Sequence, residues 1–306
     1  MLVFGHGYSA GHLTPRLRAR GWVVTGTTRS QPGRVAAAGA SPLIWPGAAE
    51  GTDADAADAA VARAIGRADA ILLSIAPDDA AGDPVLAAFG DRIAAARPGW
   101  LGYLSTTGVY GDRAGGWVDE NGALDSTTAR GRARIAAETA WGDLARAHDL
   151  PLHIFRLAGI YGPGRGPFEK LRRGTARRVI KPGQVFSRIH VEDIAQVLLA
   201  SIDRPAPGTA YNVCDDQPAP PQDVLEHAAR LLGIPPPPEV DFETAEMGQM
   251  ARSFYSDSKR VSNARLRRDL GVSLRYPDYD SGLRAILRAE GRTGDGDGGT
   301  GGGAGA

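Results

Sequence analysis

Met1-Leu2-Val3-Phe4-Gly5-His6-Gly7-Tyr8-Ser9-Ala10-Gly11-His12-Leu13 opens the chain, and this stretch decides the fold. An apolar run long enough for one strand meets Gly5-x-Gly7-x-x-Ala10, and a segment predicted to be helical up to Gly21 follows. In such a turn Gly5 permits the tight bend, Gly7 keeps side chains away from a diphosphate, and Ala10 lets the helix pack closely on the strand. The stretch therefore predicts a dinucleotide-binding turn.

The first turn of the predicted helix adds to this interpretation. The N–H groups of Tyr8, Ser9 and Ala10 have no partner within the helix and lie at the positive end of its dipole. We expect them, together with Gly5 and Gly7, to bind a cofactor. The alternative is a glycine-rich turn without a ligand, because a chain with 41 glycines produces such spacings by chance. The strand before the motif and the helix after it favour the cofactor site.

The second predicted strand, residues 22–27, ends at Thr28-Arg29-Ser30. NAD-selective sites place an Asp or Glu about 20 residues beyond the glycines, where it accepts a hydrogen bond from the ribose 2′-hydroxyl. This chain has no acidic residue there, and Arg29, with Thr28 and Ser30, suits a 2′-phosphate instead. We therefore expect NADP as the cofactor, with NAD as the other candidate. The alternative is that Arg29 is only a solvated loop charge.

Strands and helices alternate along the next part of the chain. Further strands are predicted at residues 41–45, 70–77, 100–105, 152–157 and 211–214, and helices at 53–65, 84–96 and 128–147. This pattern predicts an α/β fold, a doubly wound parallel sheet of the Rossmann type with about seven strands. Open parallel sheets bind ligands beyond the carboxyl ends of their strands, so Ser74, Ile75 and Ala76 are expected to face the cofactor.

Composition excludes several classes of protein. The 35 basic residues balance the 35 acidic ones, which argues against a broad surface for nucleic acid or for an anionic membrane. Every apolar stretch is too short to span a membrane, and the first residues lack the basic region of a signal peptide. The single cysteine, Cys214, fits a reducing compartment. We expect a cytoplasmic protein that acts on a small molecule, with no nucleic acid, membrane or metal as partner.

Later segments, with the glycine turn, carry a resemblance to a known family: 105–111 (STTGVYG), 156–164 (RLAGIYGPG), 189–195 (IHVEDIA), 211–213 (YNV) and 262–271 (SNARLRRDLG). The chain resembles the extended and atypical short-chain dehydrogenase/reductases, the NAD-dependent epimerase/dehydratase group. The resemblance implies a Rossmann domain at residues 1–160 and a smaller C-terminal substrate lobe at 161–290 that includes elements returning to the Rossmann sheet. Residues 291–306, almost all Gly and polar, are predicted to be disordered.

The family's chemistry uses a Ser or Thr that holds the substrate oxygen and a Tyr-x-x-x-Lys pair on one helical face, in which the Tyr transfers the proton and the Lys binds the ribose. The resemblance places Thr106 at the Ser/Thr position, Arg130 at the Tyr position and Arg134 at the Lys position. Arg134 is suited to bind the ribose. Arg130 cannot replace the Tyr, because a guanidinium keeps its proton at any working pH.

The proton donor is therefore open among Tyr110, Tyr161, His190, water and the substrate. We take Tyr110, with Thr106 and Arg134, as the candidate catalytic set; Leu157 and Gly159 lie in the segment that the resemblance places at the nicotinamide. The resemblance implies an NAD(P)-dependent oxidoreductase or epimerase/dehydratase-like enzyme for a carbonyl or nucleotide-sugar-like substrate. The alternative is a catalytically inactive redox sensor or scaffold that binds NADP(H).

Two further expectations concern partners. A basic stretch either holds an anionic substrate or is a solvated face; it consists of Arg165, Lys170, Arg172, Arg173, Arg177, Arg178, Lys181 and Arg188. The resemblance also implies a homodimer through the helices around residues 83–96 and 128–147.

Overall fold

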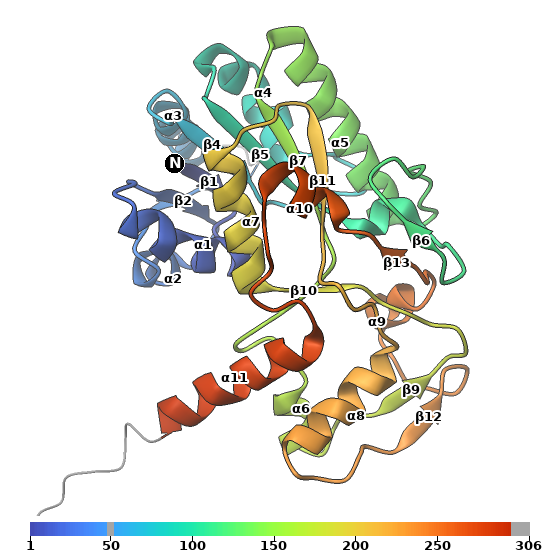
Figure 1. The fold of residues 1–306 in the computed structure, drawn as a ribbon. Helices are drawn as coiled ribbons and strands as arrows, with labels where there is room; N and C mark the ends of the chain where they lie inside the picture. Colours follow the sequence, from blue (N-terminus) through green and yellow to red (C-terminus); the bar gives the residue numbers. More distant parts are fainter. Residues whose placement is uncertain (48–51, 295–306) are drawn as a thin grey trace, which may run out of the picture.

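The computed structural model describes residues 1–47 and 52–294 and is built on a seven-stranded parallel sheet (Figure 1). The strand order is β11-β7-β5-β4-β1-β2-β3, so the chain winds outward in both directions from β1 and β4. This is the predicted doubly wound Rossmann architecture. The strands are β1 Leu2–Phe4, β2 Thr25–Thr28, β3 Ser41–Ile44, β4 Ala70–Leu73, β5 Trp100–Thr106, β7 Leu152–Leu157 and β11 Thr209–Val213.

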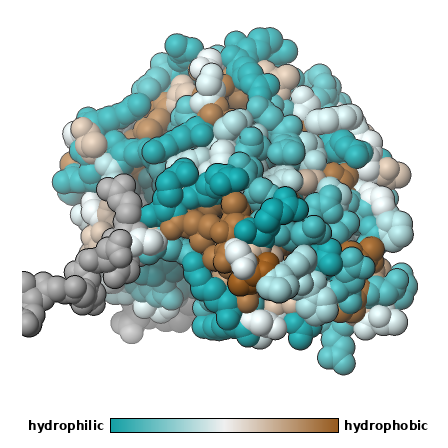
Figure 2. All heavy atoms as spheres, turned by 60° about the horizontal axis from the view of Figure 1, so that its bottom comes forward, coloured by the Kyte–Doolittle hydropathy of each residue, from teal (hydrophilic) through white to brown (hydrophobic). Residues whose placement is uncertain are grey.

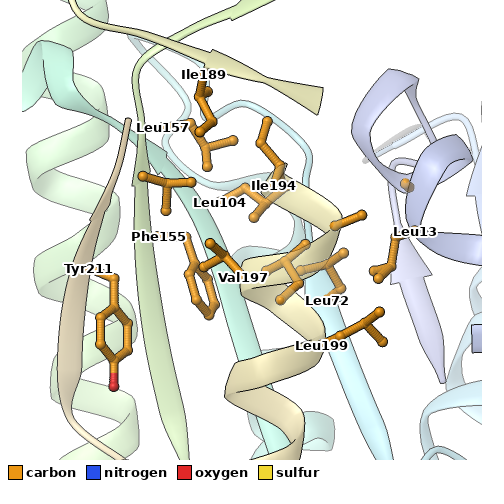
Figure 3. Close-up of a cluster of buried hydrophobic side chains, with 14 of the residues drawn as sticks. Leu13, Leu72, Leu104, Phe155, Leu157, Ile189, Ile194, Val197, Leu199 and Tyr211 are labelled. Carbon is orange, nitrogen blue, oxygen red and sulfur yellow. The ribbon is translucent and has the colours of Figure 1, made fainter. Parts of the chain in front are cut away.

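Helices cover both faces of the sheet, because its central strands are apolar on both sides. In β1, Val3 faces one buried cluster while Leu2 and Phe4 face the other. The first cluster is covered by α1 (Tyr8–Ala19) and α7 (Val191–Asp203), and Figure 3 shows Leu13 and Val197 of these helices packed over the sheet. The helices of the second cluster are α3 Thr52–Ile65, α4 Pro84–Ala96 and α5 Ala129–His148, and α2 Pro32–Ala37 packs beside β3.

A smaller part of the molecule lies below the sheet in Figure 1 and has its own apolar cluster around Phe168, Ala228 and Ile286. Figure 2 looks onto the face that includes this part and shows a mostly hydrophilic surface with an apolar area near its centre and smaller apolar areas elsewhere. Three two-stranded parallel sheets complete the fold: β8 Gly159–Tyr161 with β10 Arg188–His190, β9 Arg178–Ile180 with β12 Glu239–Asp241, and β6 Trp117–Val118 with β13 Arg260–Val261. The remaining helices are η1 Thr107–Tyr110, α6 Phe168–Arg172, α8 Pro221–Leu231, α9 Gln249–Phe254, α10 Ala264–Leu270 and α11 Tyr279–Gly294.

Three predicted boundaries were wrong. β2 begins at Thr25, not at residue 22, and β4 ends at Leu73, so Ser74 to Pro77 form a loop instead of the end of a strand. Helix α11 begins at Tyr279 and runs to Gly294, so residues 291–294 are helical although disorder was predicted for them. Residues 295–306 lie outside the described residues. The domain division at residue 160 stays a prediction, although α7, β11 and α10 do pack with the Rossmann elements.

Candidate cofactor and active site

The turn after β1 is held in place by backbone contacts and by β2. The N–H of Gly5 donates to Thr27 Oγ1 at 2.8 Å, and the N–H of His6 donates to the Thr27 carbonyl at 2.9 Å. Gly5 has φ +78°, and a Cβ there would lie 2.7 Å from Ile75 Cγ1. A Cβ on Gly7 would meet only the Gly5 carbonyl, at 3.8 Å. The fold therefore requires a glycine at position 5, whereas at position 7 the described residues leave room for a Cβ.

The amino end of α1 differs from the amino ends of α4, α5 and α7, three long helices that also pack on the sheet. Asp83 caps α4, Thr128 caps α5 and His190 caps α7, each by accepting from first-turn N–H groups. In α1, no side chain caps the N–H groups of Tyr8, Ser9 and Ala10, and the first turn holds no acidic residue. An uncapped helix end beside an empty space fits the diphosphate of a dinucleotide.

Two other predicted cofactor segments lie at the same edge of the sheet. The loop after β4 returns to the turn, since the N–H of Ser74 donates to the Phe4 carbonyl at 2.9 Å; Ile75 and Ala76 follow it. At the end of β2, Thr28 Oγ1 accepts from the N–H of Gln31, at 3.2 Å. Arg29 and Ser30 are exposed there. The structure thus brings the β4 loop against the turn and leaves the side chains of Arg29 and Ser30 to solvent.

Thr106 ends β5 and pairs in register with Leu157 of β7. Its Oγ1 accepts from the N–H of Gly108 at 3.1 Å and caps η1, so the hydroxyl proton remains free to be donated. Gly159, just beyond Leu157, is exposed and donates its N–H to the Ser187 carbonyl. Thr106, Leu157 and Gly159 therefore gather at the carboxyl edge of β5 and β7, where the resemblance places the nicotinamide.

Tyr110 is fully buried, and its hydroxyl serves the protein interior. It donates to Asn212 Oδ1 at 2.7 Å and accepts from Arg156 Nη1 at 2.9 Å. Burial raises the pKa of this phenol. A hydroxyl that is enclosed and bonded in this way cannot reach a substrate, so the structure argues against Tyr110 as the proton donor.

The same interior holds a buried ion pair that sequence reasoning missed. Arg156 donates to both carboxylate oxygens of Glu138, with Nη2 at 2.8 Å from Oε2, and Ser105 also donates to this carboxylate. We call Ser105, Tyr110, Glu138, Arg156 and Asn212 the enclosed network. It joins α5, β5, β7 and β11, and its partners lie far apart in the sequence, so no local spacing signals it.

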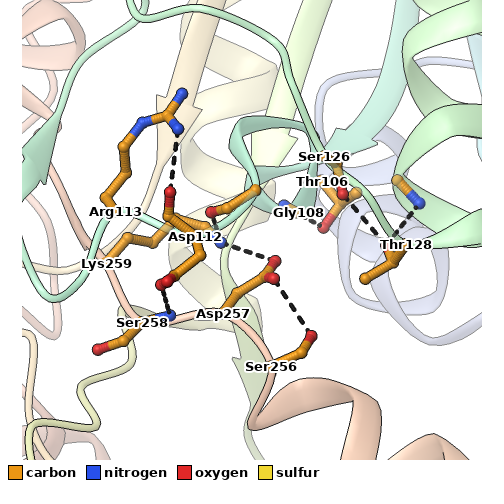
Figure 4. A network of polar contacts seen from close by, with 12 residues as sticks. Thr106, Gly108, Asp112, Arg113, Ser126, Thr128, Ser256, Asp257, Ser258 and Lys259 are labelled. Atoms are coloured by element: carbon orange, nitrogen blue, oxygen red, sulfur yellow. Dashed lines mark hydrogen bonds and ion pairs between the residues drawn. The ribbon is translucent and has the colours of Figure 1, made fainter.

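Lys259 is a second buried charged residue that the sequence analysis did not single out. Its Nζ donates to the Gly111 carbonyl at 2.6 Å and pairs with Asp257 at 3.0 Å, and burial lowers its pKa. Beside it, Asp112 Oδ1 accepts from the N–H of Ser258 at 2.7 Å (Figure 4). The segment around Lys259 therefore holds the end of η1 opposite the Thr106 cap.

The two arginines at the family's Tyr and Lys positions have different surroundings. Arg134 donates to the Leu104 carbonyl at 2.6 Å and to the Tyr103 hydroxyl at 3.2 Å, next to the end of β5. The Arg130 guanidinium lies 5.7 Å from the centre of the Phe254 ring, and Phe254 is 56% exposed. Arg134 is thus placed at the sheet edge, whereas Arg130 contacts the smaller part of the molecule.

The basic stretch separates into two groups. Arg172, Arg173 and Arg178 form ion pairs with Glu290, Glu169 and Glu226 respectively. Lys181 and Arg188 instead donate to backbone carbonyls. Arg172 and Arg173 are solvated, with side chains 49% and 70% exposed, whereas Arg178 is paired but only 17% exposed. A role of the stretch in binding an anionic substrate stays a prediction.

Asp215 lies two residues beyond β11 and is only 1% exposed. Its Oδ1 accepts from the N–H of Gln217, whereas Oδ2 has no partner among the described residues. Burial raises the pKa of this carboxyl to about 8, although the nearby Arg188 opposes the shift. The group therefore stays protonated at neutral pH. Its place after a predicted strand was visible in the sequence, but its burial was not.

The described residues show neither a metal site nor a membrane span. Within residues 1–47 and 52–294, no three His, Cys, Asp or Glu side chains are arranged to hold a metal ion. No helix in these ranges has the length and apolar composition of a membrane-spanning segment.

Comparison with known proteins agrees with this geometry. Residues 1–214 match the NAD dependent epimerase/dehydratase family. Protein YeeZ of Escherichia coli (strain K12) is 31% identical over 291 residues, which cover 90% of this chain and 96% of that relative. The 3-diazoavenalumate denitrifying reductase of a Streptomyces species is 31% identical over 150 residues, 46% of this chain and 48% of that protein.

A solved structure shares the whole architecture. A functionally unknown conserved protein from Silicibacter pomeroyi is 54% identical, with a TM-score of 0.84 over 94% of this chain and 98% of that chain.

Proposed function

This chain belongs to the NAD-dependent epimerase/dehydratase family, and from that premise we propose that it is an NADP(H)-dependent oxidoreductase acting on an anionic carbonyl compound. The family supports a nicotinamide cofactor and a coarse oxidoreductase or epimerase role. The observation that carries the proposal is the uncapped amino end of α1 beside the space at Gly7. NADP instead of NAD follows from the exposed Arg29 at the end of β2, where an acidic residue is absent.

Each cofactor-binding residue has a physical role in this proposal. The first-turn N–H groups of α1 bind the diphosphate. Thr28, Arg29 and Ser30 bind the 2′-phosphate, and the loops at Ser74 and Leu157 border the bound dinucleotide. Arg134 offers a fixed positive charge to the ribose. When bound, the cofactor supplies or accepts a hydride at its nicotinamide ring.

The substrate oxygen is held by Thr106, because the cap on η1 uses the acceptor side of that hydroxyl and leaves its proton to donate. The proton for the reaction comes from water or from the substrate, since Tyr110 is enclosed and Arg130 cannot give one up. Of the other two candidates, Tyr161 is buried and its hydroxyl donates to a backbone carbonyl, and His190 is buried and caps α7 through Nδ1. Arg188 supports an anionic substrate, because it donates only to backbone carbonyls while neighbouring arginines are neutralised by carboxylates.

Turnover of NADPH with a panel of carbonyl acids and nucleotide sugars tests this function. We expect Thr106→Val to lower kcat/KM by about 10²-fold, and Thr106→Ser, which keeps a hydroxyl, to retain most of it. The neighbouring Thr107→Val is the matched control and should leave kcat/KM unchanged. Hydride transfer that is equal in the wild type and in Thr106→Val would remove Thr106 from the mechanism.

One observation favours a second candidate function, an inactive NADP(H) sensor or scaffold. Arg130 occupies the position of the family's Tyr, and the described candidates for its role, Tyr110, Tyr161 and His190, are all buried. Tight NADPH binding without hydride transfer to any compound in the panel would select this candidate over the enzyme.

A further inference from the structure

A loop of the smaller part lies against the amino end of α1. The Tyr8 hydroxyl donates to the Pro163 carbonyl at 2.9 Å. The Arg165 guanidinium lies 5.7 Å from the centre of the Tyr8 ring. Burial raises the pKa of Tyr8 to about 12, so the phenol keeps the proton that it donates. Tyr8 is the first residue of α1, so this loop stands beside the predicted diphosphate site.

The loop is held rigidly in this position. Gly162 and Arg165 exchange two backbone hydrogen bonds, at 3.0 and 2.9 Å, which close a tight turn. Gly162 has φ +157°, and a Cβ there would lie 2.5 Å from the Tyr8 hydroxyl and 2.7 Å from Val191 Cγ1. The backbone of Arg165 is thus fixed relative to α1, while its side chain is exposed.

Within residues 1–47 and 52–294, Arg165 forms no ion pair with a carboxylate. Among the described residues, the ion pairs of the basic stretch belong to Arg172, Arg173 and Arg178. The first turn of α1 has no acid. Glu192, in the first turn of α7, already binds His12 and Arg16. A free cation therefore lies across from an uncapped helix end.

We propose that Arg165 binds the diphosphate of the nicotinamide cofactor from the side opposite α1, so that the cofactor lies between the helix end and the loop of residues 161–165. The inference rests on the cofactor site of the proposed function. The diphosphate is common to NADP and NAD, so Arg165 strengthens the binding of both cofactors. Arg29, in contrast, acts only on the 2′-phosphate.

Equilibrium binding of NADPH and of NADH, measured by calorimetry without substrate, tests the inference. Loss of a charge-assisted contact is expected to weaken the binding of both cofactors by about tenfold in Arg165→Ala. Arg165→Lys should recover part of the affinity, because it keeps the charge but not the forked donor geometry. Arg173→Ala removes another exposed arginine of the same stretch, one paired with Glu169, and should change either Kd by less than about twofold.

If the wild type binds the cofactors, three results would overturn the inference. Unchanged cofactor binding in Arg165→Ala would exclude the contact. Weakening of NADPH alone would assign Arg165 to the 2′-phosphate. An effect on substrate KM without an effect on cofactor Kd would make Arg165 a substrate residue. If the wild type itself binds neither cofactor, the proposed function fails, and the inference fails with it.

Discussion

The carboxyl ends of β1 and of β5 lie at one edge of the same sheet, but the polar groups at the two ends differ in their hydrogen bonding. At the end of β1, no side chain of the described residues caps α1, and a Cβ on Gly7 would meet only the Gly5 carbonyl there. At the ends of β5, β7 and β11, hydroxyl, carboxylate and guanidinium groups bind one another in the enclosed network. A protein interior satisfies most of its polar groups, so we take the uncapped end of α1 as the proposed ligand site.

The largest expected effect concerns the enclosed network. Glu138→Ala leaves the buried guanidinium of Arg156 without its partner and should lower the free energy of unfolding by about 3–5 kcal/mol. Denaturation with urea measures this change. Glu169→Ala, which breaks the exposed pair with Arg173, should cost less than about 1 kcal/mol. Equal effects in the two variants would mean that the network is not enclosed.

The next effect is a pH dependence at the end of β11. The folded pKa of Asp215 is about 8, above the ordinary value, so the folded state keeps a proton that the unfolded chain releases from about pH 4 upward. This group therefore lowers stability as pH rises from about 4 to 8. Asp215→Asn removes that penalty. Between pH 5 and pH 8, the free energy of unfolding of the variant should therefore rise relative to that of the wild type by on the order of a few kcal/mol. The free energy of unfolding of both proteins is measured across this pH range. The same change with pH in the two proteins would show that Asp215 is solvated.

A smaller effect concerns Arg29, at the proposed cofactor site. Arg29→Ala should weaken NADPH binding by about tenfold, because a charged contact to the 2′-phosphate is lost. NADH, which lacks this phosphate, should bind as in the wild type and serves as the internal control. Calorimetric titration with each cofactor gives the ratio of the Kd of the variant to the Kd of the wild type. An equal loss for both, or no loss, would refute the role of Arg29 in selectivity.

The smallest effect concerns Arg130, which occupies the family's Tyr position. Its contact with the exposed Phe254 ring is a surface cation–π interaction. Arg130→Ala should therefore change the free energy of unfolding by less than about 1 kcal/mol. Thermal or urea unfolding checks this. A loss comparable to that of Glu138→Ala would make Arg130 part of the enclosed network.

The sequence predicted features that depend on neighbouring residues. The central strands follow from local apolar runs, and the glycine turn follows from the spacing between Gly5 and Ala10. The enclosed network was not predictable, since Tyr110 binds Asn212, 102 residues away, and Arg156, 46 residues away. The family resemblance is confirmed by the match over residues 1–214. The roles of the site residues, the homodimer and the cytoplasmic location stay predictions.

The most direct test of the open site is calorimetric titration of the wild type and of Gly7→Val with NADPH. A Cβ at this position has room in the protein, since it meets only the Gly5 carbonyl at 3.8 Å, and the methyl groups of a valine are expected to enter the space proposed for the diphosphate. The account predicts tight binding by the wild type and at least about a 100-fold loss in Gly7→Val, with unchanged thermal stability in the absence of cofactor. Equal binding by the two proteins, or no binding by the wild type, would contradict it.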